Sequence, residues 1–212
     1  ILINLSICYL KTDQIQKALD SINQAIQLDG NVPEAWLNKG NILQELHNLS
    51  ESVVAYDRAI QLRENYDDAW VSKGNCFFAS RRYSDALFAY ERAIQINSTA
   101  SDAWFYKGLS LCEMGFYEKA LSSLEYAYRF NPRTMYLLGS LIFCKQMLCK
   151  WDDLLHQHTI LKEILAEEKK AVLPFNLLSI TDEPSFLKKA AAILVQDKYP
   201  FNPALGLIAK SP

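Results

Sequence analysis

The sequence predicts an all-α fold of stacked antiparallel helical hairpins, and three observations carry that prediction. Tryptophan, lysine-glycine and alanine columns recur at a constant spacing of 34 residues. Within each unit, apolar side chains follow the period of an α-helix. Only 7 glycines and 7 prolines occur among 212 residues, and this scarcity favours long regular elements over a loop-rich fold.

The repeat is visible in several independent columns. They hold Trp36, Trp70 and Trp104; Lys39-Gly40, Lys73-Gly74 and Lys107-Gly108; and Ala25, Ala59, Ala93 and Ala127. A further column has Tyr56 and Tyr90 at the position that Ile22 and Leu124 hold in the flanking copies. Agreement among independent columns at one spacing indicates a supersecondary unit that is built repeatedly.

The third copy indicates that each unit is a pair of helices. Trp70, Gly74 and Phe77 lie at i, i+4 and i+7, on one stripe of a helix. Ala86 and Tyr90 begin the same pattern in the second helix. Small residues let the two backbones approach closely, and the aromatic columns fill the space between hairpins. Because a lone hairpin would leave apolar surface in water, neighbouring hairpins are expected to stack.

These columns resemble the tetratricopeptide repeat, whose pattern has Trp, Leu-Gly and Tyr on the first helix, Ala and Phe or Tyr on the second, and a closing Pro. The resemblance implies a tetratricopeptide-type right-handed α-solenoid with a concave groove. It divides residues 1–134 into a truncated copy at 1–32 and whole copies at 33–66, 67–100 and 101–134. Lys replaces the usual Leu before each Gly, Ser52 replaces an Ala, and only the last copy has its closing Pro132.

One face of each first helix is not needed by the hairpin core, and in this family that face lines the groove. The groove residues expected here are Asn4, Asn38, Leu37, Asn41, Val71, Asn75, Phe78 and Phe105. We expect the four apolar members to form a strip that takes side chains of a bound peptide, because exposed apolar patches usually mark contact surfaces. The alternative is that they pack against neighbouring helices or a C-terminal cap.

Asn4 and Asn38 lie at the groove edge in the first two copies. An asparagine side chain has one acceptor and two donors, so it can pair with both backbone groups of an extended peptide. The pattern stops at Ser72 and Tyr106, and ordinary solvent-facing asparagines are the alternative. Binding of a chaperone's C-terminal carboxylate is not expected, because the groove face has no Lys or Arg to pair with it.

After Pro132 the columns blur. Residues 135–170 are predicted to form a degenerate hairpin, and residues 171–212 a helix and a linker. Three segments of this region carry a second resemblance: Cys149-Lys150-Trp151-Asp152, Pro174-Phe175 and Asp182-Glu183-Pro184. They are similar to the junction between repeats and catalytic lobes in protein O-GlcNAc transferases and SPINDLY-type glycosyltransferases. The animal enzymes have a His-rich version of the Pro-Phe stretch, which this chain lacks.

The second resemblance implies that the chain is the substrate-recruiting arm of a glycosyltransferase, whose lobes would bind a UDP-sugar beyond residue 212. Ile1 is not a Met and no charged segment follows it, so the chain is interpreted as a fragment of a longer protein. The number of repeats before residue 1 is left open. The alternative is a stand-alone tetratricopeptide scaffold or adaptor, and the gene sequence beyond Pro212 separates the two.

Composition disfavours other classes of function. A formal net charge of -2 gives no global field that would concentrate nucleic acid. No apolar run approaches the roughly 20 residues of a membrane span. Five dispersed cysteines favour a reduced compartment, cytoplasmic or nuclear. Other proteins or peptides are therefore the expected partners, and homo-oligomerisation is left open.

No catalytic constellation is recognised in the chain, so no catalytic residue, metal ligand or cofactor is assigned to it. A Gly-rich phosphate loop, a Cys-x-x-Cys pair and a Gly-x-Ser-x-Gly elbow are all missing. His156 and His158 are two residues apart, so on a helix they point about 200° from each other and cannot share one ion. An enzyme complete within these residues is the least supported reading.

Overall fold

The computed structural model describes residues 1–134, 136–150, 159–161, 188 and 191–192. Every regular element in these ranges is helical, so the all-α class is confirmed. The chain divides into two units, Ile1–Phe130 and Asn131–Pro212. No helix among the described residues has the length and apolar character of a membrane span.

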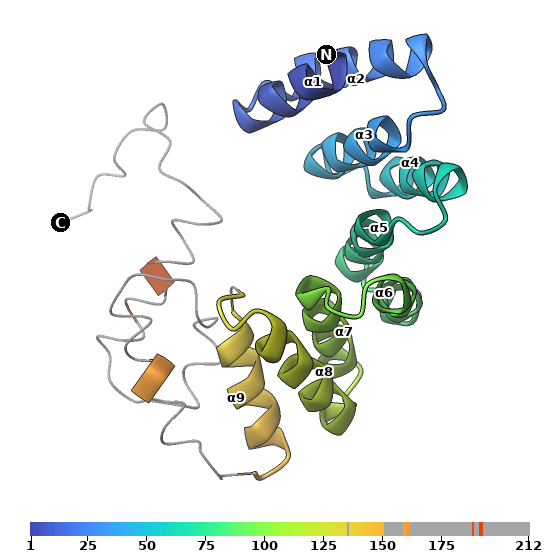
Figure 1. Ribbon diagram of the computed structural model, residues 1–212. Coiled ribbons are helices and arrows are strands. Elements are labelled where there is room, and N and C mark those ends of the chain that lie inside the picture. Colours follow the sequence, from blue (N-terminus) through green and yellow to red (C-terminus); the bar gives the residue numbers. More distant parts are fainter. Residues whose placement is uncertain (135, 151–158, 162–187, 189–190, 193–212) are drawn as a thin grey trace, which may run out of the picture. The chain divides into compact units, whose positions relative to one another are not determined.

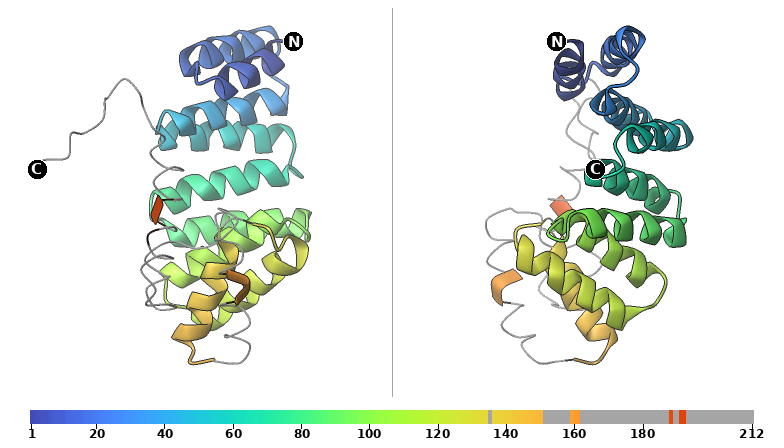
Figure 2. Two further views of the ribbon diagram at one scale, coloured as in Figure 1. Left: turned by 90° about the vertical axis from the view of Figure 1, so that its left-hand side faces the viewer. Right: turned by 45° about the vertical axis from the view of Figure 1, so that its right-hand side comes forward.

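The first unit is a tetratricopeptide-type α-solenoid of helical hairpins (Figure 1). Its helices are α1 (Leu2–Lys11), α2 (Ile15–Leu28), α3 (Pro33–Glu45), α4 (Leu49–Leu62), α5 (Asp67–Ala79), α6 (Tyr83–Ile96), α7 (Ser101–Glu113) and α8 (Tyr117–Phe130). Each odd-numbered helix packs against the even-numbered helix that follows it. Figure 2 shows these hairpins from the side, layered one on the next.

The first helices of the hairpins lie on the more closely packed side of this unit. Contacts join α1 with α3, α3 with α5, and α5 with α7, whereas the second helices do not contact one another across hairpins. In Figure 1, α3, α5 and α7 accordingly lie along one side, with α4 and α6 on the other. We call the surface of α1, α3, α5 and α7 that faces away from the second helices the inner face.

The packing inside each hairpin explains the glycine and tyrosine columns. Tyr90 is fully buried, and a Cβ atom built on Gly74 would lie 2.5 Å from its Cε1 atom. Gly40 meets the ring of Tyr56 in the same way. In the first copy, the buried pair Ser6 and Ile22 occupies these two positions. The aromatic ring therefore lies directly on the opposite backbone, which only glycine permits.

Each hairpin turns through a residue in the left-handed conformation. These residues are Asp13, His47, Arg81 and Gly115, with φ values of 58°, 57°, 57° and 79°. The turn after α5 shows the hydrogen bonds: the Arg81 N–H donates to Phe78 O, and the Arg82 N–H donates to Phe77 O, both at 2.9 Å. This is the Schellman motif, which satisfies the last carbonyl groups of a helix.

The second unit contains α9 (Leu137–Met147), whose buried residues include Leu138 and Ile142. This helix falls within the segment predicted as a degenerate hairpin. Trp151, the Pro174-Phe175 stretch and the Asp182-Glu183-Pro184 stretch lie outside the described residues, as do His156 and His158.

Candidate functional site

The amide side chains of the inner face belong partly to the hairpin core. The buried Tyr90 hydroxyl donates to Asn75 Oδ1 at 2.9 Å. The Tyr56 hydroxyl lies 2.9 Å from Asn41 Oδ1 and 3.0 Å from Gln44 Oε1. Burial raises the pKa of both tyrosines, so their hydroxyl groups stay protonated and keep donating. Each asparagine is thereby held in one orientation by the second helix of its own hairpin.

The other predicted asparagines are more accessible. Asn4 is exposed on α1, and Asn38 is partly exposed on α3. Neither makes a side-chain hydrogen bond with another described residue. The predicted asparagines therefore fall into two kinds: two that a tyrosine orients, and two that no described partner holds.

The predicted apolar strip is uneven in exposure. Leu37, Val71 and Phe78 are partly buried, and Leu37 also packs against the core cluster of Ala59, Tyr66 and Ala69. Phe105 departs from the expectation of an open side chain, because it is only 5% exposed. Its ring packs against Tyr106 with 5.2 Å between centroids. For Phe105, packing was the alternative interpretation, and the structure favours it.

Sequence reasoning missed an aromatic cluster around Tyr106, which had seemed only to interrupt the asparagine pattern. The Tyr106 ring stacks on Tyr90 at 6.0 Å and meets Phe78 nearly edge-on at 6.2 Å. Phe78 in turn contacts Tyr83 at 5.5 Å, and the Tyr83 hydroxyl donates to Glu113 Oε2 at 3.2 Å. Along the inner face, the accessible amide groups of α1 and α3 thus give way to an aromatic cluster formed by α5, α7 and the start of α6.

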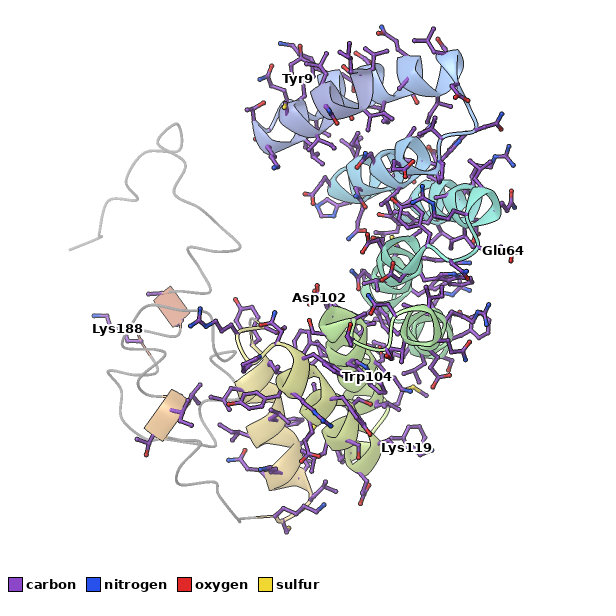
Figure 3. The ribbon with its side chains drawn as sticks, viewed as in Figure 1. Tyr9, Glu64, Asp102, Trp104, Lys119 and Lys188 are labelled. Carbon is purple, nitrogen blue, oxygen red and sulfur yellow. The ribbon has the colours of Figure 1, made fainter. Side chains whose placement is uncertain are left out.

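Carboxylates border this aromatic part. Asp67, Asp68, Val71 and Asp102 line one hollow between the first turns of α5 and α7, and Figure 3 labels Asp102 there. Asp67 accepts a 2.7 Å hydrogen bond from Asn97 Nδ2. Asp68 and Asp102 pair with no cation among the described residues. Burial, and then the charges of Asp67 and Asp102, raise the pKa of Asp68 above its ordinary value.

The equivalent carboxylate in the second copy has a partner. Glu34 forms an ion pair with Arg63, which also lies over the Tyr66 ring. Hydrogen bonding from its own backbone N–H, and then Arg63, lowers the pKa of Glu34. Asn97 stands where Arg63 stands one copy earlier, so the next copy lacks this cation.

The recurrent lysines are turned away from the inner face. Lys73 Nζ lies 2.5 Å from Asp57 Oδ1, and Lys107 Nζ lies 2.9 Å from Glu91 Oε1. These partner carboxylates belong to the second helices α4 and α6. Each recurrent lysine also lies over the tryptophan of its own helix, with Nζ to ring-centroid distances of 5.6, 5.2 and 5.4 Å for Lys39, Lys73 and Lys107.

No group of three or more metal-binding side chains occurs among the described residues. In the same part of the chain, the inner face offers amide, aromatic and carboxylate groups. What this arrangement can do chemically is hydrogen-bond, pack and attract charge.

Comparison with known proteins supports the assignment of the repeats. Models of the tetratricopeptide repeat match residues 1–32, 33–66 and 67–99. The chain therefore contains tetratricopeptide repeats over these residues. A search of curated protein sequences gives no match.

Solved structures share the fold. The structure entitled "Functional Characterization of Pseudomonas Aeruginosa pilF" has a TM-score of 0.73 and 16% identity, covering 95% of this chain and 91% of that one. A MamA fragment from Desulfovibrio magneticus RS-1 has a TM-score of 0.68 and 21% identity, covering 77% and 93%. YrrB, described as a TPR protein with an unusual peptide-binding site, has a TM-score of 0.61 and 16% identity, covering 90% of each chain.

Proposed function

We propose that this chain is a protein-interaction module that binds an extended peptide segment or a partner helix on its inner face. One observation carries the proposal: apolar and amide side chains remain accessible there after the hairpins have packed. Phe78, Val71 and Leu37 are partly exposed, and so is Asn38 beside them. Apolar groups with a few oriented polar groups among them are typical of surfaces that bind another chain.

The oriented amides give a reason why such binding would be specific. Tyr56 and Tyr90 engage the carbonyl oxygens of Asn41 and Asn75 and leave the amide N–H groups for a ligand. A donor that is already held in place loses little entropy when a peptide carbonyl accepts from it. Asn4 and Asn38 supply further donors and acceptors along the same face.

Phe78→Ala tests the proposal, with Phe88→Ala as the matched control. Phe88 lies on α6, is 59% exposed and contacts Trp70 instead of the inner face. Peptides would be selected from a displayed random library on the unmodified chain, and their affinities measured by fluorescence anisotropy. We expect Phe78→Ala to weaken binding about tenfold, which corresponds to about 1.4 kcal/mol. Equal affinities for the two variants, with helicity unchanged, would end the proposal.

A finer proposal is that this module is the substrate-recruiting arm of an O-GlcNAc transferase-like glycosyltransferase, in the cytoplasm or nucleus. Its support is the sequence resemblance of the stretch from Cys149 to Pro184, together with the groove asparagines Asn4 and Asn38, which match that family, although Ser72 and Tyr106 depart from it. The repeat models end at residue 99, and the matches above name no transferase. Sequencing the parent gene beyond Pro212 tests it. Sugar-nucleotide-binding lobes would favour the arm, and a stop codon or further repeats would favour a stand-alone scaffold or adaptor.

A further inference from the structure

We infer that the segment bound by the inner face is basic, with a Lys or Arg side chain placed at Asp68 and Asp102 and an apolar side chain placed on Phe78. This inference rests on the proposed function and names the class of partner. The occupant is an extended segment of another protein, in which a cationic residue precedes or follows an apolar residue by about four positions.

The inner face has a local excess of negative charge at the first turns of α5 and α7. Asp68 and Asp102 are exposed carboxylates on α5 and α7, and no described cation pairs with either of them. The whole chain has a formal net charge of only -2, so this concentration of negative charge is local. A ligand cation therefore meets uncompensated carboxylates at this surface, which favours its approach and its orientation.

The cations of the first unit that lie nearest in sequence are engaged elsewhere. Lys73 and Lys107 pair with Asp57 and Glu91 of the second helices, and Arg63 pairs with Glu34. Arg81 lies just beyond the C-terminal end of α5, whereas Asp68 lies in the first turn of this helix. Thirteen residues of helix correspond to about 20 Å, well beyond the screening length of about 8 Å at physiological salt. Among the described residues, neither aspartate forms an ion pair.

The hollow beside these two aspartates also offers an apolar surface, which the methylene stem of a Lys or Arg side chain can contact. Val71 lines the same hollow as Asp68 and Asp102 and lies one helical turn from Asp68. A bound cationic side chain can cover Val71 with its stem while its charged end meets the carboxylates. A neutral polar side chain lacks the charge and gains only a weaker hydrogen bond with the carboxylates.

The geometry of α5 sets the spacing of the ligand. Asp68 and Phe78 are ten residues apart on one helix, which corresponds to about 15 Å. An extended peptide advances about 3.3 Å per residue, so four or five residues span this length. Phe78 presents its ring at the far end, in contact with the Tyr106 ring of α7. The inference thus predicts a spacing within the ligand as well as its charge.

A selection experiment tests this inference. Random dodecapeptides are displayed and selected on the unmodified chain, on Asp68→Asn with Asp102→Asn, and on a charge-matched control, Glu118→Gln with Glu125→Gln. Both control positions are exposed on α8, and their substitution removes the same number of charges. Circular dichroism checks that each variant is folded.

We expect the unmodified chain and the control to enrich peptides with Lys or Arg four or five positions from an apolar residue. The Asp68→Asn, Asp102→Asn pair should bind these peptides at least about tenfold more weakly. Raising NaCl from about 50 mM to about 300 mM should weaken binding to the unmodified chain several-fold more than to this pair.

The possible failures are distinguishable. Selection of neutral or acidic peptides that lose affinity with Phe78→Ala would overturn the basic ligand and leave the proposed function intact. Basic peptides that bind the aspartate-substituted pair as tightly as the unmodified chain would likewise overturn it. If the unmodified chain selects no peptide at all, both proposals fail.

Discussion

Substituting Gly74 by alanine should open the third hairpin, because the new methyl group has no room. Its Cβ would lie 2.5, 2.8 and 2.9 Å from three carbon atoms of the Tyr90 ring. The ring cannot retreat easily, since Tyr90 is fully buried and its hydroxyl is bound to Asn75. Real Cβ atoms do not approach carbon so closely, so the two helices must separate or the ring must leave its place.

The size of the effect follows from two opposing terms. Overpacking a core by one methyl group costs about 1–3 kcal/mol. Replacing glycine by alanine inside a helix stabilises it by about 1 kcal/mol. Because three contacts at Gly74 are too short at once, we expect the upper part of the first range, and a net loss of about 2 kcal/mol.

Cys76 reports this opening directly. It lies in the same helix as Gly74 and is fully buried, and burial raises the pKa of its thiol to about 11. At pH 8 the closed hairpin therefore presents an inert thiol, and reaction with a maleimide requires opening. A loss of about 2 kcal/mol should accelerate labelling of Cys76 about thirtyfold. Peptide mass spectrometry separates this site from the exposed Cys8 and Cys149.

The first copy suggests a rescue. There Ser6 and Ile22 are both buried at the positions of Gly74 and Tyr90. The change Gly74→Ser combined with Tyr90→Ile should therefore destabilise the chain by at least about 1 kcal/mol less than the sum of the single changes. Strict additivity, or a Gly74→Ala labelling rate equal to that of the exposed-site control Ser84→Ala, would refute the close-contact argument.

Three further predictions concern the turns and the charges. Arg81→Gly should stabilise the chain by about 1 kcal/mol and Gly115→Ala should destabilise it by a similar amount, since both positions have a left-handed backbone. Thermal unfolding measures both variants, and melting temperatures that shift in the same direction would contradict this. The raised pKa of Asp68 means that the folded state holds this proton more tightly, so its contribution to stability falls as pH rises above 3.8. Asp68→Asn should therefore be more stable than the unmodified chain in urea at pH 7, but not below pH 3.8. Lys73→Ala should lose about 1 kcal/mol with its bond to Asp57, and less at high salt.

The fold could be predicted because its determinants recur within the chain itself. Trp36, Trp70 and Trp104 sit at one spacing, and each helix carries its own periodic stripe. Such signals are local in sequence and depend on no distant segment. The left-handed turn residues escaped prediction for the opposite reason. The side chains of Asp13, His47 and Arg81 have no chemical property in common. Their left-handed conformation is imposed by the way the preceding helix ends.

The roles of the inner-face residues were less predictable, although the sequence contains a signal for two of them. Asn41 and Asn75 occur in the copies that have Tyr56 and Tyr90, whereas Leu109 accompanies Leu124. This joint change across a hairpin predicts the hydroxyl-to-amide bonds found in the structure. The burial of Phe105 has no comparable signal, because its exposure depends on tertiary packing that its helical position does not determine.

Constancy and variation along the repeats divide the chain into two kinds of positions. The hairpin core uses the same few positions of each first helix and keeps them nearly constant, because any change there meets a buried partner. The inner face varies more, and one of its positions holds Asn4, Asn38, Ser72 and Tyr106 in successive copies. Tyr106 stacks on the buried Tyr90, but the other copies fill this position without an aromatic ring, so we expect the change from amide to aromatic to reflect the ligand as well as the core. The inner face then offers accessible amide groups to a peptide backbone on α1 and α3, and carboxylate and aromatic groups to its side chains on α5 and α7.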